Sequence, residues 1–117
     1  HDVGDAVLRA VADIITKTLK QFPGDHIIGR WGGEEFLGYL SGEEKEVKRI
    51  AEEIRENIEN YEFKHRKITV SVGLAQFGKD GNTHESVTKK ADVALYHSKE
   101  NGRNRVTRYH YTMGEGE

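Results

Sequence analysis

The residues best suited to chemistry lie in one short stretch, where two glycines are followed by two glutamates at positions 32–35. Apolar residues on both sides (27–28 and 36–40) predict two strands joined by a glycine turn, a β-hairpin. Glycine allows positive φ and leaves room for a ligand against bare backbone. Neighbours in an extended chain point to opposite sides, so one of Glu34 and Glu35 can hold a cation while the other faces a substrate or a partner subunit. The same residues also fit a plain turn in which the glutamates only meet solvent.

Composition restricts the class of protein. The chain has 117 residues, which suits one domain with one core. Eighteen basic and twenty acidic residues give a net charge of -2, so the whole chain has no attraction to a nucleic-acid polymer or an anionic membrane. With no cysteine, disulfides and Cys-type zinc sites are excluded. No apolar run is long enough to cross a membrane, and no signal peptide is recognised. We therefore expect a soluble, cytoplasmic domain without membrane contact.

Three amphipathic patterns predict helices that position the hairpin. Apolar residues recur every three or four positions in each pattern. The first helix is followed by the breaker at 23–25, and Asp5 near its first turn suits the helix dipole, so a capping role is the simplest reading of that residue. The third helix has Thr83 as N-cap and ends at Asn101 and Gly102. The expected buried positions are Leu8, Val11, Ile15, Leu19 and Phe22; Val47, Ile50, Ala51, Ile54 and Ile58; and Val87, Ala91, Ala94 and Leu95.

Alternation of β-branched and small residues predicts another strand over residues 68–75, and residues 105–109 suit a short last strand. The small alternate residues indicate close packing on their side of the strand. The order helix, strand, strand, helix, strand, helix, strand predicts an α+β fold with helices on one mainly antiparallel sheet. It matches a β-α-β-β-α-β arrangement whose first strand is missing.

Three separated stretches resemble a single family. They are Gly4-Asp5 with Val7-Leu8, residues 30–36 (RWGGEEF), and residues 90–106, with the TVSVG run of residues 69–73 between them. Over residues 1 to about 108 the chain is similar to the GGDEF domain of bacterial diguanylate cyclases, in its GGEEF spelling. We place this domain at 1–109 and a frayed tail at 110–117. The resemblance implies a ferredoxin-like, nucleotidyl-cyclase-type palm with an antiparallel-rich sheet and helices packed on it.

The resemblance also implies an activity. Such enzymes join two GTP molecules into cyclic di-GMP, a signal-transduction molecule, and release pyrophosphate. Each domain binds one GTP, so a homodimer is required for catalysis. The implied cofactor is Mg²⁺, with Mn²⁺ as an alternative. Family members usually carry an upstream sensory domain that brings two catalytic domains together.

By the same resemblance, both glutamates of the hairpin are catalytic. Glu34 would ligate Mg²⁺, an ion that prefers oxygen ligands. Glu35 would act near the attacking ribose hydroxyl or the facing subunit. Gly32 and Gly33 would let the nucleotide lie against the hairpin.

Three further residues are implied in GTP binding. Asp5 would recognise guanine, because a carboxylate only accepts hydrogen bonds and guanine offers adjacent N1–H and amino donors. Lys99 and Arg103 would hold the β- and γ-phosphates. The alternative for this pair is that the two cations only complement the C-terminal end of a helix.

The chain departs from the family at two places. The family domain begins upstream of His1, and that front part carries a central strand with an aspartate that shares the Mg²⁺. We therefore expect little cyclase activity from these 117 residues alone. Many members also carry an Arg-x-x-Asp motif before the hairpin that binds product and inhibits. Here residues 23–26 read Pro-Gly-Asp-His, so we expect no product inhibition through this primary site.

Two other functions remain open. The first is a non-catalytic GGDEF-like module that binds GTP or docks onto a partner without turnover. The second is an α+β interaction domain without a nucleotide site. The six histidines have no close helical spacing typical of a zinc site, and we interpret them as surface or packing residues.

Overall fold

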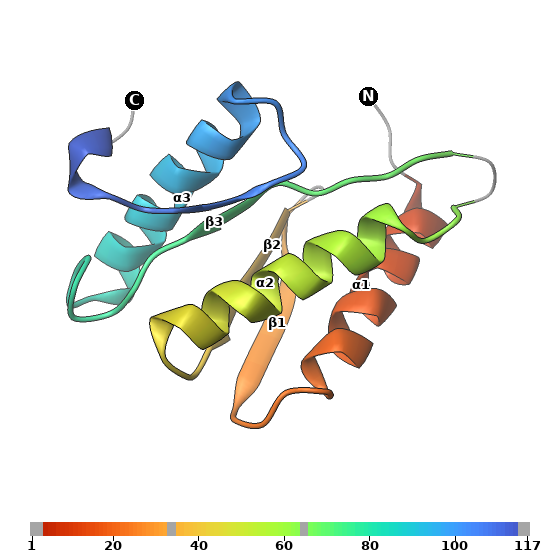
Figure 1. Cartoon of the computed structure of the whole chain (residues 1–117), viewed down its shortest axis with the longest axis horizontal. Coiled ribbons are helices and arrows are strands. Elements are labelled where there is room, and N and C mark those ends of the chain that lie inside the picture. The colour runs from red at the N-terminus through yellow and green to blue at the C-terminus, as the bar shows by residue number, and fades with distance from the viewer. Residues whose placement is uncertain (1–3, 33–34, 64–65, 115–117) are drawn as a thin grey trace. The chain divides into compact units, whose positions relative to one another are not determined.

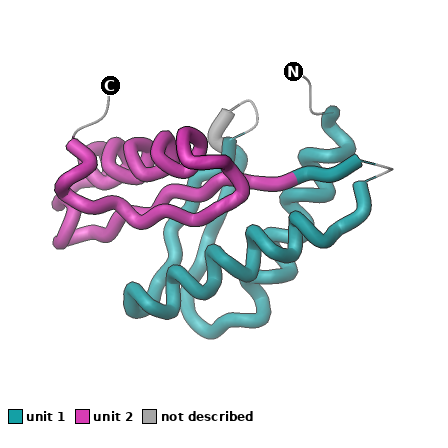
Figure 2. Tube along the Cα trace, turned by 45° about the horizontal axis from the view of Figure 1, so that its top comes forward, with its two compact units in different colours: residues 1–68 teal, residues 69–117 magenta. Residues whose placement is uncertain are grey.

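The structure is a computed structural model that describes residues 4–32, 35–63 and 66–114. Within these residues it has an α+β fold (Figure 1), as predicted. The chain divides into two compact units, His1–Ile68 and Thr69–Glu117 (Figure 2), and each is described by itself below. The elements in order are α1 (Asp5–Leu19), β1 (His26–Gly32), β2 (Glu35–Leu40), α2 (Glu44–Glu59), β3 (Val72–Leu74), α3 (His84–Glu100), β4 (Val106–Arg108) and the 3₁₀ helix η1 (Tyr111–Met113).

The first unit buries the apolar faces of α1 and α2 against each other, and α1 also contacts β1. Most of the expected core positions are confirmed, whereas Leu19, Phe22 and Val47 are only half-buried. The buried apolar residues of α1 and α2 are Leu8, Val11, Ile15, Ile50, Ala51, Ile54 and Ile58, and Phe63 after α2 is buried as well. A polar contact also joins the helices, because the hydroxyl of the buried Thr18 accepts a hydrogen bond from the Asn57 amide at 3.0 Å and donates to the Ile14 carbonyl at 2.7 Å.

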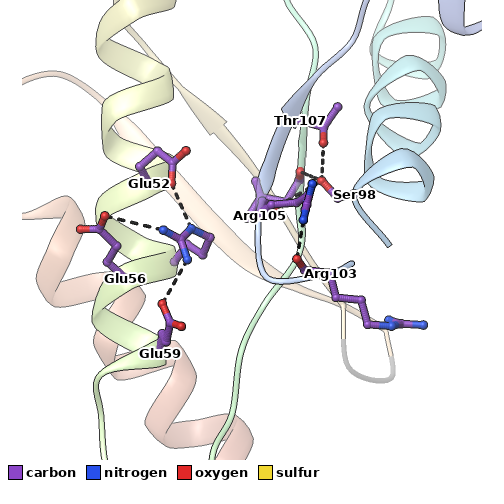
Figure 3. Close-up of polar contacts among 9 residues, drawn as sticks. Glu52, Glu56, Glu59, Ser98, Arg103, Arg105 and Thr107 are labelled. Atoms are coloured by element: carbon purple, nitrogen blue, oxygen red, sulfur yellow. Dashed lines mark hydrogen bonds and ion pairs between the residues drawn. The ribbon is translucent and has the colours of Figure 1, made fainter. Parts of the chain in front are cut away.

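The outer face of α2 carries an ion-pair cluster centred on Arg55. Its guanidinium lies 3.0 Å from the Glu52 carboxylate, 3.2 Å from Glu59 and 3.6 Å from Glu56 (Figure 3). The hydrogen bond that Arg55 donates to Glu52 raises the pKa of Arg55 above its usual value, with Glu59 adding to the effect. These charges satisfy one another along the helix.

The predicted hairpin forms, with β1 and β2 antiparallel. The register pairs Arg30 with Phe36 and Gly32 with Glu35, so Trp31 is an additional residue in β1 and the ladder is bulged there. Gly38 faces Ile28 across the ladder, and a Cβ built at Gly38 would lie 2.2 Å from the Ile28 side chain. Only glycine allows the two strands to approach this closely.

The second unit is a β-α-β arrangement in which β3 and β4 pair in parallel and α3 packs on both. A Cβ at Gly73 would lie 2.3 Å from the Ala91 carbonyl oxygen and 2.3 Å from the Leu95 nitrogen. This contact confirms the predicted close packing on the small side of the strand. At the start of α3, the Thr83 hydroxyl accepts from the Ser86 N–H at 3.0 Å, so the predicted N-cap is confirmed.

Two expectations about the strands need correction. The strand predicted over residues 68–75 is regular only at Val72–Leu74, because β4 offers ladder partners to just these three residues. The single, mainly antiparallel sheet is also wrong in detail. In the described part of the chain the strands form two two-stranded ladders, of which the second is parallel.

The core of the second unit lies between α3 and the segment after β4. Val93, Ala94 and Tyr109 are buried together, with Met113 packed against them. Of the predicted positions Val87 and Ala94 are buried, whereas Ala91 and Leu95 are half-buried. The Tyr109 hydroxyl donates to the Gly114 carbonyl at 3.1 Å. The described part of the expected frayed tail is therefore folded, because its one methionine joins an apolar core.

No described helix has the length and hydropathy needed to span a bilayer.

Candidate active site

The hairpin presents Glu35 at its described end. Glu35 is the first residue of β2, is exposed, and lies opposite Gly32 in the ladder. Gly33 and Glu34 lie outside the described residues, so the metal-binding role of Glu34 stays a prediction. Among the described residues, no group of three or more His, Asp or Glu side chains is placed to hold a metal ion.

Asp5 is the first residue of α1, and the N-cap position belongs to Gly4, which has no side chain to cap with. Asp5 therefore makes no side-chain cap hydrogen bond, but its carboxylate lies in the first turn, where it suits the helix dipole as the simplest reading predicted. The Asp5 carboxylate is exposed, and within the described ranges it has no hydrogen-bond or ion-pair partner. A carboxylate in this state remains able to accept two donors from a ligand.

A pocket of about 160 Å³ lies between α1 and the hairpin. Leu8 and Phe36 are among the residues that line this pocket. Asp5 lies one helical turn before Leu8, and Glu35 directly precedes Phe36. Two arginines, Arg9 and Arg30, are among the residues that line the pocket. Arg9 was not among the predicted site residues, and its one signal in the sequence is its position one turn after Asp5. The complete lining is Leu8, Arg9, Ala12, Ile15, Thr16, Ile28, Gly29, Arg30 and Phe36.

The end of α3 positions the two predicted phosphate ligands. Lys99 is half-buried in the last helical turn. The chain then turns at Gly102, where φ is +117°, and the Arg103 N–H donates to the Ser98 carbonyl at 2.9 Å. This is the hydrogen bond of a Schellman turn, so the predicted left-handed helix end is confirmed.

Left-handed backbone continues beyond the glycine. Arg103 has φ of +62° and Asn104 has φ of +47°. Such values are uncommon for residues with a Cβ, and two in succession indicate a conformation held by its surroundings. The Arg103 side chain is exposed, extends away from Ser98 and Thr107 (Figure 3), and has no ion-pair partner in the described part of the chain.

The predicted site residues thus fall into two groups. Asp5, Gly32 and Glu35 belong to the first unit, and each lies within three positions in the chain of a residue that lines the pocket between α1 and the hairpin. Lys99 and Arg103 belong to the second unit, where the turn after α3 presents both.

The family described as diguanylate cyclase, GGDEF domain, matches residues 1–105 of this chain. This chain belongs to that family. Its GGDEF domain is 38% identical over 112 residues to Diguanylate cyclase A of Treponema denticola, a match that covers 92% of this chain and 29% of the relative. The chain therefore spans less than a third of the length of this curated relative.

Solved structures of GGDEF domains share the fold. The GGDEF domain of DgcB from Caulobacter crescentus, determined in complex with c-di-GMP, is 36% identical with a TM-score of 0.77 over 89% of this chain and 63% of that chain. The active GGEEF domain of a diguanylate cyclase from Vibrio cholerae is 30% identical with a TM-score of 0.77, over 94% of this chain and 70% of that chain. The predicted family and its nucleotidyl-cyclase palm are thereby confirmed.

Proposed function

We propose that this GGDEF domain is the catalytic domain of a diguanylate cyclase that acts as a homodimer. In each of two equivalent steps, the 3′-hydroxyl oxygen of one GTP forms a bond to the α-phosphorus of the other. The bond between the α- and β-phosphates breaks and pyrophosphate leaves. Two GTP molecules thus give one cyclic di-GMP and two pyrophosphates. Such chemistry depends on positioning and on stabilising charge.

The glutamates of the hairpin serve this reaction in different ways. Glu34 holds Mg²⁺, or Mn²⁺ in its place, and the carboxylate oxygens available here are the ligands these ions prefer. The metal supplies charge neutralisation to the phosphate oxygens. Glu35 lies beside the attacking hydroxyl and takes up its proton. Gly32 and Gly33 leave the backbone bare for the nucleotide.

Asp5 selects guanine. Its exposed carboxylate accepts from the N1–H and the amino group of the base. Adenine lacks the N1–H, so it would leave one carboxylate oxygen without a donor when the site closes. The pocket between α1 and the hairpin supports this assignment, because its lining begins one turn beyond Asp5.

Lys99 and Arg103 hold the β- and γ-phosphates, the part of the substrate that leaves. The observation that supports the proposal most directly is the turn after α3. It presents the Arg103 guanidinium, which has no protein partner in the described ranges. Arg103 follows Lys99, in the last helical turn, by four residues. Arginine binds phosphate through two parallel hydrogen bonds, and lysine adds a mobile point charge.

The test is an incubation of the protein with GTP and Mg²⁺, followed by chromatographic identification of the products. We expect cyclic di-GMP, and we expect the Glu35→Gln variant, which keeps the size of the side chain, to lose it. Binding of GTP without any cyclic di-GMP would favour the non-catalytic module instead. Neither binding nor product would leave an interaction domain.

A further inference from the structure

Ser98 is a polar residue of α3 with no solvent exposure. Its hydroxyl oxygen lies 2.9 Å from the Val72 carbonyl oxygen, 3.2 Å from the Arg105 carbonyl oxygen and 2.6 Å from the Thr107 hydroxyl (Figure 3). These partners belong to β3, to β4 and to the residue just before β4. One hydroxyl therefore joins the helix to both strands of the second unit.

The hydrogens determine which bonds can coexist. The two carbonyl oxygens only accept, and each hydroxyl has one proton to donate. The arrangement that satisfies most groups has Thr107 donating to Ser98 and Ser98 donating to the Val72 carbonyl. The Arg105 carbonyl, at the longer distance, also accepts from the Val72 N–H at 2.9 Å. Ser98 and Thr107 thus work as a pair, and removing either hydroxyl leaves the other without its partner.

The backbone of Ser98 is hydrogen-bonded as well, since its carbonyl accepts a hydrogen bond from the Arg103 N–H at 2.9 Å. The loop between Ser98 and β4 is further tied from within, because the Arg105 Nε donates to the Arg103 carbonyl at 3.2 Å. Ser98 thus has two roles. Its side chain is anchored on the strands, and its backbone carbonyl closes the left-handed turn. Its position fixes both Lys99, the next residue, and Arg103.

We infer that Ser98 and Thr107 are positioning residues that keep Lys99 and Arg103 in the arrangement that binds the β- and γ-phosphates of GTP. This inference rests on the proposed function of Lys99 and Arg103. An alanine would fit the volume of a serine, so packing alone does not require the hydroxyl at position 98. The left-handed backbone at Arg103 needs such an anchor, because most residues with a Cβ, arginine included, do not favour it.

The test compares the binding of GTP and of GMP, which lacks the β- and γ-phosphates, by titration calorimetry on the full chain. We expect Ser98→Ala and Thr107→Val each to weaken GTP binding by about tenfold, the scale of one lost hydrogen bond, and to leave GMP binding unchanged. The double variant should be little weaker than Ser98→Ala alone, because that substitution already removes both the bond from Thr107 and the bond to the Val72 carbonyl. Thr107→Ser keeps the hydroxyl and should bind GTP normally.

Two comparisons separate this inference from the proposed function. If Lys99→Ala and Arg103→Ala lower the preference for GTP over GMP but Ser98→Ala and Thr107→Val do not, the inference is wrong and the proposed function stands. If neither Lys99→Ala nor Arg103→Ala changes that preference, or the unaltered chain does not bind GTP, both are wrong. An equal loss of GTP and GMP binding in Ser98→Ala would indicate a purely structural role and would also overturn the inference. Should Ser98→Ala fail to fold, Thr107→Val against Thr107→Ser decides the question.

Discussion

Single residues in this domain carry conformations that their side chains do not favour. Arg103 and Asn104 are both left-handed, although only glycine adopts this backbone freely. At Arg103 the unfavourable backbone coincides with a guanidinium that has no described partner. A glycine would suit this turn better, so the arginine does not serve the stability of the turn, which agrees with the phosphate-binding role that we propose for it.

Two substitutions at Arg103 separate these effects. Arg103→Ala and Arg103→Gly both remove the guanidinium, so we expect both to weaken GTP binding to the same extent. They should differ in stability, because alanine retains the strain of the left-handed backbone. We expect the free energy of unfolding of Arg103→Gly to be about 1 kcal/mol larger than that of Arg103→Ala. Calorimetric titration and urea unfolding measure the two quantities. Equal stability of the variants would show that the backbone at this position is not strained.

At the scale of elements, α3 packs closely on β3 in the second unit. This packing depends on Gly73, which has the backbone of α3 directly against it. Backbone atoms of a helix cannot move aside individually, as the end of a flexible side chain can. A methyl group at this position must therefore push the whole helix away from the strand.

We expect Gly73→Ala to destabilise the domain by about 2 kcal/mol or more, which is the usual cost of overpacking. Gly29→Ala is the matched control, because it also lies in a strand but has no atom within 4 Å of the added methyl group. Thermal unfolding of the two variants checks the expectation. A Gly73→Ala variant as stable as Gly29→Ala would mean that α3 does not pack on β3 as described.

At the scale of the whole molecule, the turn before the hairpin is the segment at which we predict no inhibition by product. This turn is closed by its own hydrogen bonds. The His26 ring donates from Nε2 to the Pro23 carbonyl at 2.9 Å and accepts at Nδ1 from the Ser41 N–H at 3.2 Å. The Ser41 hydroxyl in turn accepts from the Asp25 N–H at 3.0 Å. No arginine is present among residues 23–26 to bind a cyclic dinucleotide.

We therefore expect that Asp25→Ala leaves the affinity for cyclic di-GMP unchanged, and that added product does not inhibit cyclisation through this turn. Equilibrium binding of cyclic di-GMP to both forms is the measurement, and Lys20→Ala, at an exposed position in the segment before the same turn, is a suitable comparison. Tight binding that disappears with Asp25→Ala would show that the carboxylate binds product without the arginine.

The sequence was most informative where structure is local. The faces of α1 and α2, the Thr83 cap and the turn at Gly102 follow from spacing and from residue type within a few positions. The length of β3 was overestimated, because it depends on how many residues β4 offers as partners. The roles of Ser98 and Thr107 were not found, because nothing nearby in the chain indicates that two hydroxyls meet carbonyl oxygens of distant strands. Residues 33–34 lie outside the described structure, so the metal ligand among the site residues is still known only from the family.

Helix α3 is fixed at both of its ends, by the Thr83–Ser86 box at the first turn and by the Ser98–Arg103 hydrogen bond at the last. An incoming polyphosphate would accordingly meet main chain that is already ordered. The conformational entropy of that segment is lost during folding rather than during association, so more of the electrostatic attraction remains available as affinity.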